Sequence, residues 1–444
     1  MRKIEITAGR LAESLLKFSG AGKLSLLDSC GVGSTGRDLL IAGVQPVEAF
    51  ELTNKDPNET LRIFDEKLGG DLAAIFTVSY DFGSKLQNTR LHSKISAPQE
   101  PDIYLSLFDC LIVHDYDTAE TFVSGNPAKF DRIEEILMRS TASNGSETLL
   151  SSKRAIARSN FTKSAYLKAL DEIKELIRSG ETYQANLTQQ ISVGLPEEMS
   201  PAEIFLRLRQ NHPAPFAAYI DRGPSTVVSA SPELFIRISE DPNGGRRVTS
   251  SPIKGTRRRG NSAAEDKALR AELLGSEKDR AENTMIVDLM RNDLGRICEY
   301  GTVAVESLCK LEEHPTLFHL VSTVSGTLKD SVAFSDIIKA VFPCGSITGA
   351  PKIRTMQIID EIETMPRSLS MGAIGCFIPD GTFDLRDIFE MSVAIRTMVI
   401  RDKTAVFNVG GGIVIDSDPE SEYDESMLKA KALLDALGAG GFDQ

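Results

Sequence analysis

Short apolar runs alternate with turn-forming segments through the first part of the chain, and this pattern constrains the fold more than any other feature. Residues 71–79 (DLAAIFTVS) and 103–114 (IYLSLFDCLIVH) have the length and composition of strands bounded by loops. In the rest of the chain, strand-like and helix-like segments follow one another without regular strand–helix–strand repetition. The sequence therefore predicts an α+β or mixed α/β fold.

A clear amphipathic helix is predicted after residue 160. Apolar residues recur at helical spacing from Tyr166 to Ile177, Thr162 can cap the start of the helix, and Gly180 can end it. Residues 139–152, which precede this helix, are rich in Ser, Thr, Asn and Gly and have the composition of a surface connection at a boundary. Further strands are expected at residues 226–229 and 405–409, and further helices at residues 281–291, 335–341 and 426–437.

The composition is that of a globular protein with a sizeable core. The chain has 444 residues, of which 41% are hydrophobic and 25% charged. At about 150 residues per domain, this length allows about three domains or one large enzyme domain. The 63 acidic and 50 basic residues give a formal charge of −13. That balance argues against nucleic-acid binding, which depends on clustered Lys and Arg.

The cysteines and the apolar segments indicate a compartment. Six cysteines, at positions 30, 110, 298, 309, 344 and 376, form no CxxC pair, and a secreted scaffold of this size would need more of them. Residues 1–16 carry charges throughout, and no later stretch approaches the roughly 20 apolar residues of a membrane span. We therefore expect a cytoplasmic protein that binds neither membranes nor nucleic acids.

Two groups of carboxylates are spaced so that each group shares one face of a predicted helix. Asp279 and Glu282 are three residues apart, and Glu422, Glu425 and Lys429 follow the spacing i, i+3, i+7 near the start of the last helix. Carboxylates from two helices can hold one Mg²⁺ between them, because this ion usually takes only one or two protein carboxylates. The alternative is that each group complements the dipole of its own helix.

Lys254 stands in the segment SPIKGTRRRG, where a strand is expected to run into a turn. Its side chain can project into a cleft, but a lysine acts as a nucleophile only where its surroundings destabilise the ammonium form. The arginines at positions 257–259 could instead form a localisation signal or a nucleic-acid patch. The acidic balance of the chain disfavours both of these interpretations.

Two glycine-rich segments and one histidine are also candidates. Residues 344–355 (CGSITGAPKIRT) lack the GxxxxGK[ST] spacing of a nucleotide phosphate loop. Gly410 to Gly412 are expected to follow a strand, where they either let the backbone approach an anionic ligand or form a tight turn or bulge. His319 lies in an apolar, strand-like run and is either a buried core residue or an acid–base group.

These segments occur together in the order and approximate spacing of one enzyme family. The motifs are SPELF (231–235), SPIKGTRRRG, KDRAENTMIVDLMRNDLGRI, HLVSTVSG, GSITGAPKIRTMQIIDEIE, SVAIRT (392–397) and GGGIVIDSDPESEYDE. In them the chain resembles the chorismate-utilising enzymes, and within that family component I of aminodeoxychorismate synthase and of anthranilate synthase. The resemblance covers residues 160–440 and, more loosely, the segment GDLAAIFTVSYDFG nearer the N-terminus.

The resemblance implies the architecture. It is a large mixed α/β chorismate-binding fold of the α+β class, with antiparallel sheets packed as a sandwich core and helices outside. Residues 1–150 correspond to the N-terminal region of anthranilate synthase component I, and residues 160–440 to the chorismate-binding catalytic region. The two regions are expected to interleave into one compact two-lobed unit.

The resemblance also implies which residues take part in the chemistry. Gln184, in ETYQANL, occupies the place where water-adding members have a lysine base, which favours ammonia as the nucleophile. Lys254 matches the lysine that attacks C2 of chorismate in enzymes that aminate C4, where anthranilate synthases normally have alanine. Glu233 matches the acid that protonates the departing C4 hydroxyl. His319 matches an active-site histidine.

Ligands for a metal and for the substrate are implied in the same way. Glu282 and Glu425 match the Mg²⁺ ligands, and Asp279 and Glu422 lie close by in the outer shell. The metal is expected to neutralise the ring carboxylate of chorismate. The groups that match substrate-binding positions are Arg396, Lys429 and the backbone amides of Gly411, Gly412, Thr348 and Gly349.

Two segments depart from the family pattern. RSLSMG places Ser370 where the family has a tyrosine that contacts substrate. The segment at residues 380–397 is about six residues longer than the usual DGxxDxxxAIRT, judged by that motif alone. Both departures are expected to lie near the substrate pocket and to affect its fine geometry.

The implied activity is the conversion of chorismate and ammonia to 4-amino-4-deoxychorismate, the precursor of p-aminobenzoate and folate. Nothing in the 444 residues resembles a glutamine amidotransferase, so a separate amidotransferase subunit, component II, is expected to supply the ammonia. The first alternative is anthranilate synthase component I, which aminates C2 and releases pyruvate. The second is a non-catalytic chorismate-binding subunit, which the retention of the whole catalytic set disfavours.

Overall fold

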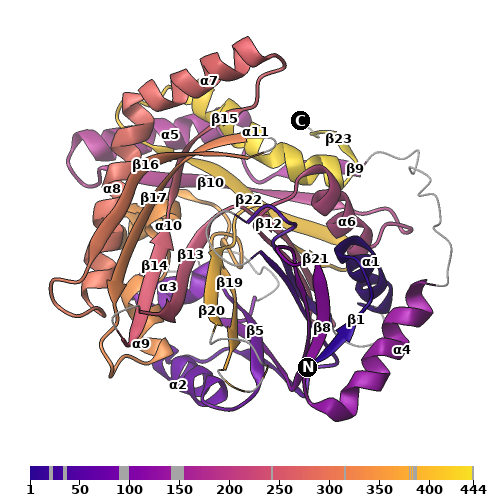
Figure 1. The fold of residues 1–444 in the computed structure, drawn as a ribbon. Helices are drawn as coiled ribbons and strands as arrows, with labels where there is room; N and C mark the ends of the chain where they lie inside the picture. Colours follow the sequence, from indigo (N-terminus) through magenta and orange to yellow (C-terminus); the bar gives the residue numbers. More distant parts are fainter. Residues whose placement is uncertain are drawn as a thin grey trace.

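The protein is built on two large β-sheets that face each other, with helices on their outer sides (Figure 1). The computed structural model describes residues 1–19, 24–33, 38–89, 100–141, 155–241, 244–314, 317–379, 381, 383 and 388–442. Within these ranges every strand pairing is antiparallel except that of β9 (Ala155–Ser159) with β23 (Ala439–Phe442). The predicted α+β class with antiparallel sheets is confirmed.

The first sheet contains thirteen of the described strands. Its order is β1 (Arg2–Ile4), β8 (Glu120–Gly125), β7 (Cys110–Asp115), β3 (Leu39–Val44), β2 (Leu24–Asp28), β11 (Phe216–Asp221), β12 (Thr226–Ser231), β21 (Thr397–Arg401), β22 (Thr404–Ile413), β10 (Gln184–Gly194), β9 and β23. The short β18 (Gly349–Ala350) pairs with β10 outside this path.

The second sheet contains ten described strands. Its order is β15 (Ile253–Arg258), β17 (Leu317–Thr327), β14 (Arg246–Ser251), β13 (Leu234–Glu240), β20 (Ile388–Val393), β19 (Ala373–Ile378), β5 (Ala73–Val78), β6 (Ile103–Phe108) and β4 (Glu48–Leu52), with β16 (Ala304–Glu313) on β17. Both sheets join early and late strands, because β2 pairs with β11 in the first sheet and β5 pairs with β19 in the second.

Eleven α-helices are described, together with two short 3₁₀ turns, Pro127–Lys129 and Gly345–Ile347. They are α1 (Ala8–Phe18), α2 (Pro57–Leu68), α3 (Tyr80–Leu86), α4 (Phe130–Thr141), α5 (Lys163–Arg178), α6 (Pro201–Asn211), α7 (Ala263–Gly275), α8 (Glu277–Gly295), α9 (Phe334–Val341), α10 (Lys352–Ile362) and α11 (Pro419–Ala436). No helix in the described part of the chain is long and apolar enough to cross a membrane.

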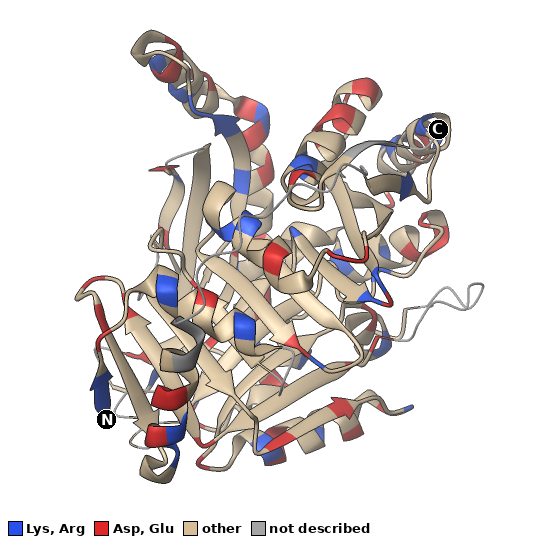
Figure 2. Ribbon diagram, turned by 90° about the vertical axis from the view of Figure 1, so that its right-hand side faces the viewer, with Lys and Arg blue, Asp and Glu red and all other residues tan. Residues whose placement is uncertain are grey.

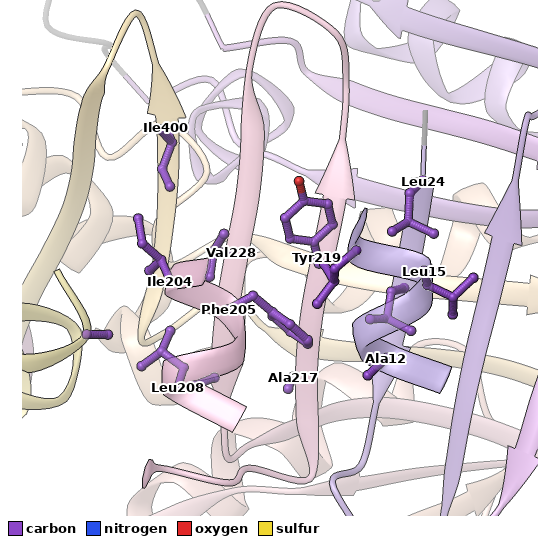
Figure 3. Close-up of a cluster of buried hydrophobic side chains, with 14 of the residues drawn as sticks. Ala12, Leu15, Leu24, Ile204, Phe205, Leu208, Ala217, Tyr219, Val228 and Ile400 are labelled. Carbon is purple, nitrogen blue, oxygen red and sulfur yellow. The ribbon is translucent and has the colours of Figure 1, made fainter. Parts of the chain in front are cut away.

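Alternation along the strands produces a sandwich. In β5, Ala73 and Ile75 belong to an apolar cluster shared with strands of the first sheet, whereas Phe76 belongs to the cluster under α2, α8 and α9. Successive strand residues point to opposite faces, so one face of each sheet packs against the other sheet and one against helices. Figure 3 shows this helix side on the first sheet, where Leu15 of α1 and Phe205 of α6 lie over the strands.

The predicted amphipathic helix is confirmed as α5. The hydroxyl of Thr162 accepts a hydrogen bond from the backbone N–H of Ala165 at 3.2 Å, and Gly180, just past the end, has a φ of 80°. The last helix begins earlier than predicted, at Pro419 rather than at residue 426. The reason is local: Pro419 fits the first turn, and the Asp418 side chain caps the helix by accepting from the N–H of Ser421 at 3.0 Å.

Gly410 to Gly412 lie inside β22 rather than after it, which corrects the prediction that they follow a strand. They pair with three successive residues of β10, and a Cβ at Gly410 would lie 1.9 Å from the carbonyl oxygen of Leu187. At Gly410 a glycine is therefore required by the close contact between the two strands, whereas Gly411 and Gly412 lie against side chains. The proposed boundary at residues 139–152 falls almost wholly outside the described residues, as do residues 380, 382 and 384–387 of the longer segment.

Basic and acidic residues are mixed along the outer helices (Figure 2). The basic run at positions 257–259 is also balanced by acidic residues, all of them in α7. Arg257 pairs with Glu272 at 2.7 Å, Arg258 with Glu265, and Arg259 with Asp266 at 2.7 Å. These arginines are neutralised by their neighbours in the fold.

Candidate active site

The candidate residues from both sheets meet where β10 and β22 face β15. A Cβ added at Gly412 would lie 2.2 Å from Gln184 Nε2 and 3.3 Å from Lys254 Nζ. The absence of a side chain at Gly412 thus leaves room for these two groups to approach each other across the sheets. Lys254 Nζ also donates a hydrogen bond to the carbonyl oxygen of Ser346 at 3.3 Å.

Glu233 lies between β12 and β13, with its side chain buried in the same region. Its backbone N–H contacts the Ser231 hydroxyl at 3.3 Å, and its carbonyl accepts from the N–H of Val393 at 3.0 Å. The Oε1 atom is buried and has no hydrogen-bond partner among the described residues. Burial raises the pKa of Glu233, and this effect outweighs the hydrogen bond from Ser346 and the nearby charge of Lys254. The carboxyl therefore keeps its proton to a higher pH than an exposed glutamate.

His319 extends from β17, and its Nδ1 lies 2.9 Å from the hydroxyl of Thr256. The strand prediction for this run is confirmed. The side chain is 3% exposed, and burial, followed by the positive charge of Arg396, lowers the pKa of His319 to about 3. The imidazole is therefore neutral at physiological pH.

Arg396 precedes β21 and has a φ of 48°, in the left-handed region. Its backbone carbonyl accepts from the N–H of Ala230 at 3.0 Å, which anchors this conformation. The guanidinium makes no hydrogen bond within the described ranges. Burial lowers the pKa of Arg396, and the nearby Glu233 opposes the shift. The structure thus holds a partly buried cation whose hydrogen-bonding capacity is available to a ligand.

The N-terminal halves of α8 and α11 bring the acidic residues together around one lysine. Lys278 Nζ lies 2.8 Å from Glu422 Oε1 and 4.0 Å from Glu282 Oε1, and its charge also acts on Glu425. Burial raises the pKa of Glu282, with Lys254 and Lys278 opposing the shift. Neither helix therefore uses its acids only to complement its own dipole.

Lys429, one turn along α11 from Glu425, closes this side of the site. Its Nζ lies 2.8 Å from Glu425 Oε1 and donates to the carbonyl oxygen of Gly410 at 3.1 Å. The charge of Lys429 lowers the pKa of Glu425, so this carboxylate stays ionised. A Cβ at Gly411 would lie 3.3 Å from Glu422 Oε2 and 3.8 Å from Lys429 Nζ, so the glycine strand passes directly beside the charged groups.

A metal can be accommodated by this donor set. No three His, Cys, Asp or Glu side chains in the described part of the chain surround a common point. Mg²⁺ needs only one or two protein carboxylates, with substrate and water completing its shell. Glu282 and Glu425 come from different helices and both act on Lys278 through their charge, so they are the two carboxylates that would hold such an ion.

Asp279 is turned away from this group toward a different partner. Its Oδ2 lies 3.2 Å from Arg257 Nη2, and its Cβ and Cγ would each lie 3.0 Å from a Cβ at Gly255. It still acts on Glu282 through its charge. The structure therefore gives Asp279 a structural ion pair in addition to its place near the acids.

The segment at Thr348 and Gly349 forms the edge of the site next to β10. The carbonyl of Thr348 accepts from the N–H of Asn186 at 2.8 Å, and its hydroxyl donates to the carbonyl of Cys344 at 3.0 Å. Gly349 has a φ of 141°, and a Cβ there would lie 2.0 Å from the carbonyl oxygen of Gln184. Only glycine allows this close approach.

Ser370 is buried, and its hydroxyl accepts from the backbone N–H of Asn408 at 3.1 Å. Its neighbours Ser368 and Met371 have φ values of 54° and 67°, a left-handed conformation that is costly for side chains other than glycine. This segment is thus a strained turn beside β22, held by contacts at both ends.

Two residues of the site escaped the sequence analysis: Lys278, which joins the acids of α8 and α11, and Ser346, which contacts both Lys254 and Glu233. Both lie inside quoted motifs. Lys278 also stands four residues before Glu282, a spacing that places both on one helix face, and this was the available signal.

A separate cavity of about 360 Å³ lies between the sheets, away from these residues. It is lined by residues of β2, β3 and β11 on one side and of β13, β19 and β20 on the other, among them Asp28, Phe216, Arg237 and Cys376. None of the candidate catalytic, substrate-binding or metal-binding residues lines it.

Sequence comparison places these observations in a family. The family described as chorismate binding enzyme matches residues 28–435. Aminodeoxychorismate synthase component 1 of Bacillus subtilis is 36% identical over 412 residues, which cover 90% of this chain and 84% of that protein. Anthranilate synthase component 1 of Aquifex aeolicus is also 36% identical, over 76% of this chain and 68% of that protein. A 45% identical region, 61% of this chain, spans only 36% of an aminodeoxychorismate synthase of Streptomyces pristinaespiralis.

The fold agrees with these matches. Anthranilate synthase component I of Streptococcus pneumoniae superposes with a TM-score of 0.75 at 27% identity, over 90% of this chain and 93% of that one. The family match covers nearly the whole length of the two sheets and every candidate site residue. The chain therefore belongs to the chorismate-binding enzymes.

Proposed function

We propose that the protein aminates chorismate at C4 and releases 4-amino-4-deoxychorismate and water. One observation carries the proposal: Lys254 Nζ and the Gln184 amide share the space over Gly412. An amine that can add to the ring thus faces a neutral amide that cannot activate water. Members of the family that add water would need a base at the position of Gln184.

In the first step, the neutral amine of Lys254 adds to C2 of the ring, the two conjugated ring double bonds each shift by one position, and the C–O bond at C4 breaks. Glu233 gives its proton to the departing hydroxyl, which leaves as water, because hydroxide is a poor leaving group. The raised pKa of Glu233 supports this role, since burial favours the protonated carboxyl that the step consumes.

In the second step, ammonia adds to C4, the two conjugated double bonds shift back, and the bond between C2 and Lys254 breaks. The new C4 ammonium returns a proton to the Glu233 carboxylate, which restores both groups. His319, neutral because of its burial, supplies an uncharged hydrogen-bonding edge to the pocket rather than a second cation.

The substrate is a dianion, so the pocket must supply positive groups. We assign its carboxylates to Arg396 and Lys429 and to the backbone amides of Gly411, Gly412, Thr348 and Gly349. We also propose that Glu282 and Glu425 hold one Mg²⁺, with Glu422 and Asp279 nearby, and that the bound ion neutralises the ring carboxylate. The available guanidinium of Arg396 supports its share of this assignment.

Ammonia is proposed to come from glutamine through a separate amidotransferase subunit. The support is the match to 84% of a protein named component 1, a name that implies a second component. The chain alone is expected to use ammonium salts but not glutamine. Product from glutamine with the purified chain alone would refute the partner.

The second candidate function is amination at C2 with loss of pyruvate, as in anthranilate synthases. It is favoured by the 36% identity to the Aquifex aeolicus protein and by the superposition on the Streptococcus pneumoniae structure. Both candidates share the fold and the acidic groups, so only the product separates them.

Mass spectrometry of the product formed from chorismate, ammonium and Mg²⁺ tests the proposal. 4-Amino-4-deoxychorismate is expected, and p-aminobenzoate should appear only after aminodeoxychorismate lyase is added. Fluorescent anthranilate as the direct product would refute amination at C4 and establish the second candidate. Measurable chorismate binding with no turnover at high ammonium would refute both.

A further inference from the structure

One strand of the site, β10, has two faces of different character. Ala185 and Leu187 belong to an apolar cluster with Tyr166 and Leu170 of α5. Because successive strand residues point to opposite faces, the polar residues of even number lie on the face turned toward the second sheet. The first four of them along the strand are Gln184, Asn186, Thr188 and Gln190, of which the first three are buried.

The far half of this polar row is satisfied by protein groups. Thr188 donates both its backbone N–H and its hydroxyl to Glu363 Oε1, at 2.7 and 2.8 Å. Gln190 Nε2 donates to the carbonyl oxygen of Pro366 at 3.1 Å. These two residues therefore stabilise the fold without a ligand.

The near half of the row is not satisfied. Gln184 Oε1 and Asn186 Nδ2 are both buried and have no hydrogen-bond partner in the described part of the chain. A buried polar atom without a partner is costly, and in folded proteins it is normally paired with a protein group, a water or a ligand. Along β10 the side chains therefore change from paired to unpaired at the end of the strand that lies beside Lys254.

The backbone of Asn186 is held on both sides, so its side-chain position is well defined. Its N–H donates to the carbonyl of Thr348 at 2.8 Å, and its carbonyl accepts from Arg367 Nη2 at 2.5 Å. Asn186 also pairs directly with Gly412 across the strands. Its carboxamide is thus free while its main chain is fixed.

Directly paired residues place their side chains on the same face of a sheet. The side chain of Asn186 therefore lies on the face where Gly412 meets Gln184 and Lys254 Nζ. Gly412 has no side chain to fill the space opposite Asn186. An unpaired donor consequently borders the space that the reacting ring would occupy.

We propose that Asn186 is a substrate-binding residue whose Nδ2 donates a hydrogen bond to a carboxylate oxygen of chorismate beside Lys254. The proposal rests on the proposed function for the identity of the dianionic substrate. An uncharged donor can bind one carboxylate oxygen without changing the charge of the pocket, so Arg396 and Lys429 remain the side chains assigned to neutralise the dianion.

Two substitutions test the proposal through chorismate binding. Asn186→Leu keeps much of the volume and removes the donor, and Asn186→Asp keeps the shape and adds a negative charge. A hydrogen bond to a charged group is worth about a tenfold to hundredfold change in affinity. The KM for chorismate is therefore expected to rise about tenfold to hundredfold in Asn186→Leu, and further in Asn186→Asp because of repulsion. The kcat should change less than KM, and Tm should be kept.

Thr188→Val is the matched control on the same strand face. It removes a hydroxyl bonded to Glu363 and should lower Tm while leaving the KM for chorismate within about threefold of wild type. If Asn186→Leu does not fold, the KM of the isosteric Asn186→Asp variant still tests the proposal. KM values within twofold of wild type in the folded Asn186 variants would overturn the proposal, as would lowered Tm and kcat at unchanged KM.

Calorimetric titration of chorismate without ammonia separates this inference from the proposed function. Weakened binding in the Asn186 variants, with anthranilate as the wild-type product, would uphold the role of Asn186 and refute amination at C4. Unchanged binding, with 4-amino-4-deoxychorismate as the wild-type product, would refute the role of Asn186 alone.

Discussion

The space between the two sheets has two contrasting parts. In one part, Ile75 and Ile374 of the second sheet pack against Leu111 and Ile220, and these side chains are almost fully buried. In the other part, the same sheets bring together Glu233, Lys254, His319, Arg396 and Gln184.

The difference between these two parts shows that one pair of packed sheets contains both a stabilising core and a polar site. The apolar part gains free energy from the burial of its side chains. The polar part keeps Glu233 Oε1, Gln184 Oε1 and Asn186 Nδ2 without protein partners in the described ranges. In the polar part these unpaired groups lie beside Lys254 and Gly412, where a ligand can bind them, so changes in the two parts should separate activity from stability.

The largest effect is expected at Lys254. Lys254→Ala removes the proposed nucleophile and should lower kcat for 4-amino-4-deoxychorismate by about 10⁴-fold. Tm should stay within a few degrees, because the ammonium makes only one hydrogen bond within the described residues, to Ser346. Steady-state kinetics with ammonium as donor, and thermal unfolding, provide both measurements. Activity close to wild type would show that Lys254 forms no covalent bond.

Removing the proposed acid should have the next largest effect. Glu233→Gln keeps the shape but has no proton to give, and kcat should fall about 10²-fold to 10⁴-fold. Because the pKa of Glu233 is raised by burial, wild-type activity should persist above the pH at which an exposed glutamate ionises and fall as pH rises through the shifted pKa. The pH profile of kcat/KM checks this, and the alkaline decline should be absent in the variant. An alkaline decline of kcat/KM that is still present in Glu233→Gln would mean that a group other than Glu233 causes it.

A change in the apolar part should reverse the pattern. Ile75→Ala removes methyl groups from an almost fully buried position of the apolar cluster and should lower the free energy of unfolding by about 2–5 kcal/mol. The KM for chorismate and kcat at 25 °C should stay within about twofold of wild type. Urea unfolding and steady-state kinetics on the same sample test the separation. A large loss of activity without a loss of stability would mean that the two parts are coupled.

The smallest effect concerns the acid stability of the polar part. The pKa of His319 is lowered to about 3 from an ordinary value of 6.5, so the unfolded chain binds a proton that the folded chain does not. Burial of the neutral imidazole therefore costs no stability above about pH 6.5, and it lowers the free energy of unfolding progressively as pH falls from 6.5 toward 3. His319→Gln should therefore be less sensitive to acid, by on the order of 1–3 kcal/mol at pH 4.5 relative to pH 7. Equal acid sensitivity in both proteins, measured by urea unfolding, would contradict this.

Local elements were determined by the sequence. The helix at α5 was predicted with its cap because Thr162 and the apolar spacing act within a few residues. The family assignment was predicted in the same way, because its motifs are continuous segments. The start of α11 was missed because the apolar pattern begins after the acidic first turn, although Asp418 and Pro419 already define the cap.

Only the tertiary structure decided how these segments work together. Gly410 to Gly412 were expected after a strand, yet their place inside β22 is imposed by close contact with β10, which lies more than 200 residues earlier in the chain. The same holds for Asn186. Its amide is unpaired whereas Thr188 on the same strand face bonds to Glu363, and this difference is known only from the folded structure. Sequence patterns report short-range preferences, whereas pairing, burial and pKa depend on residues that only folding brings together.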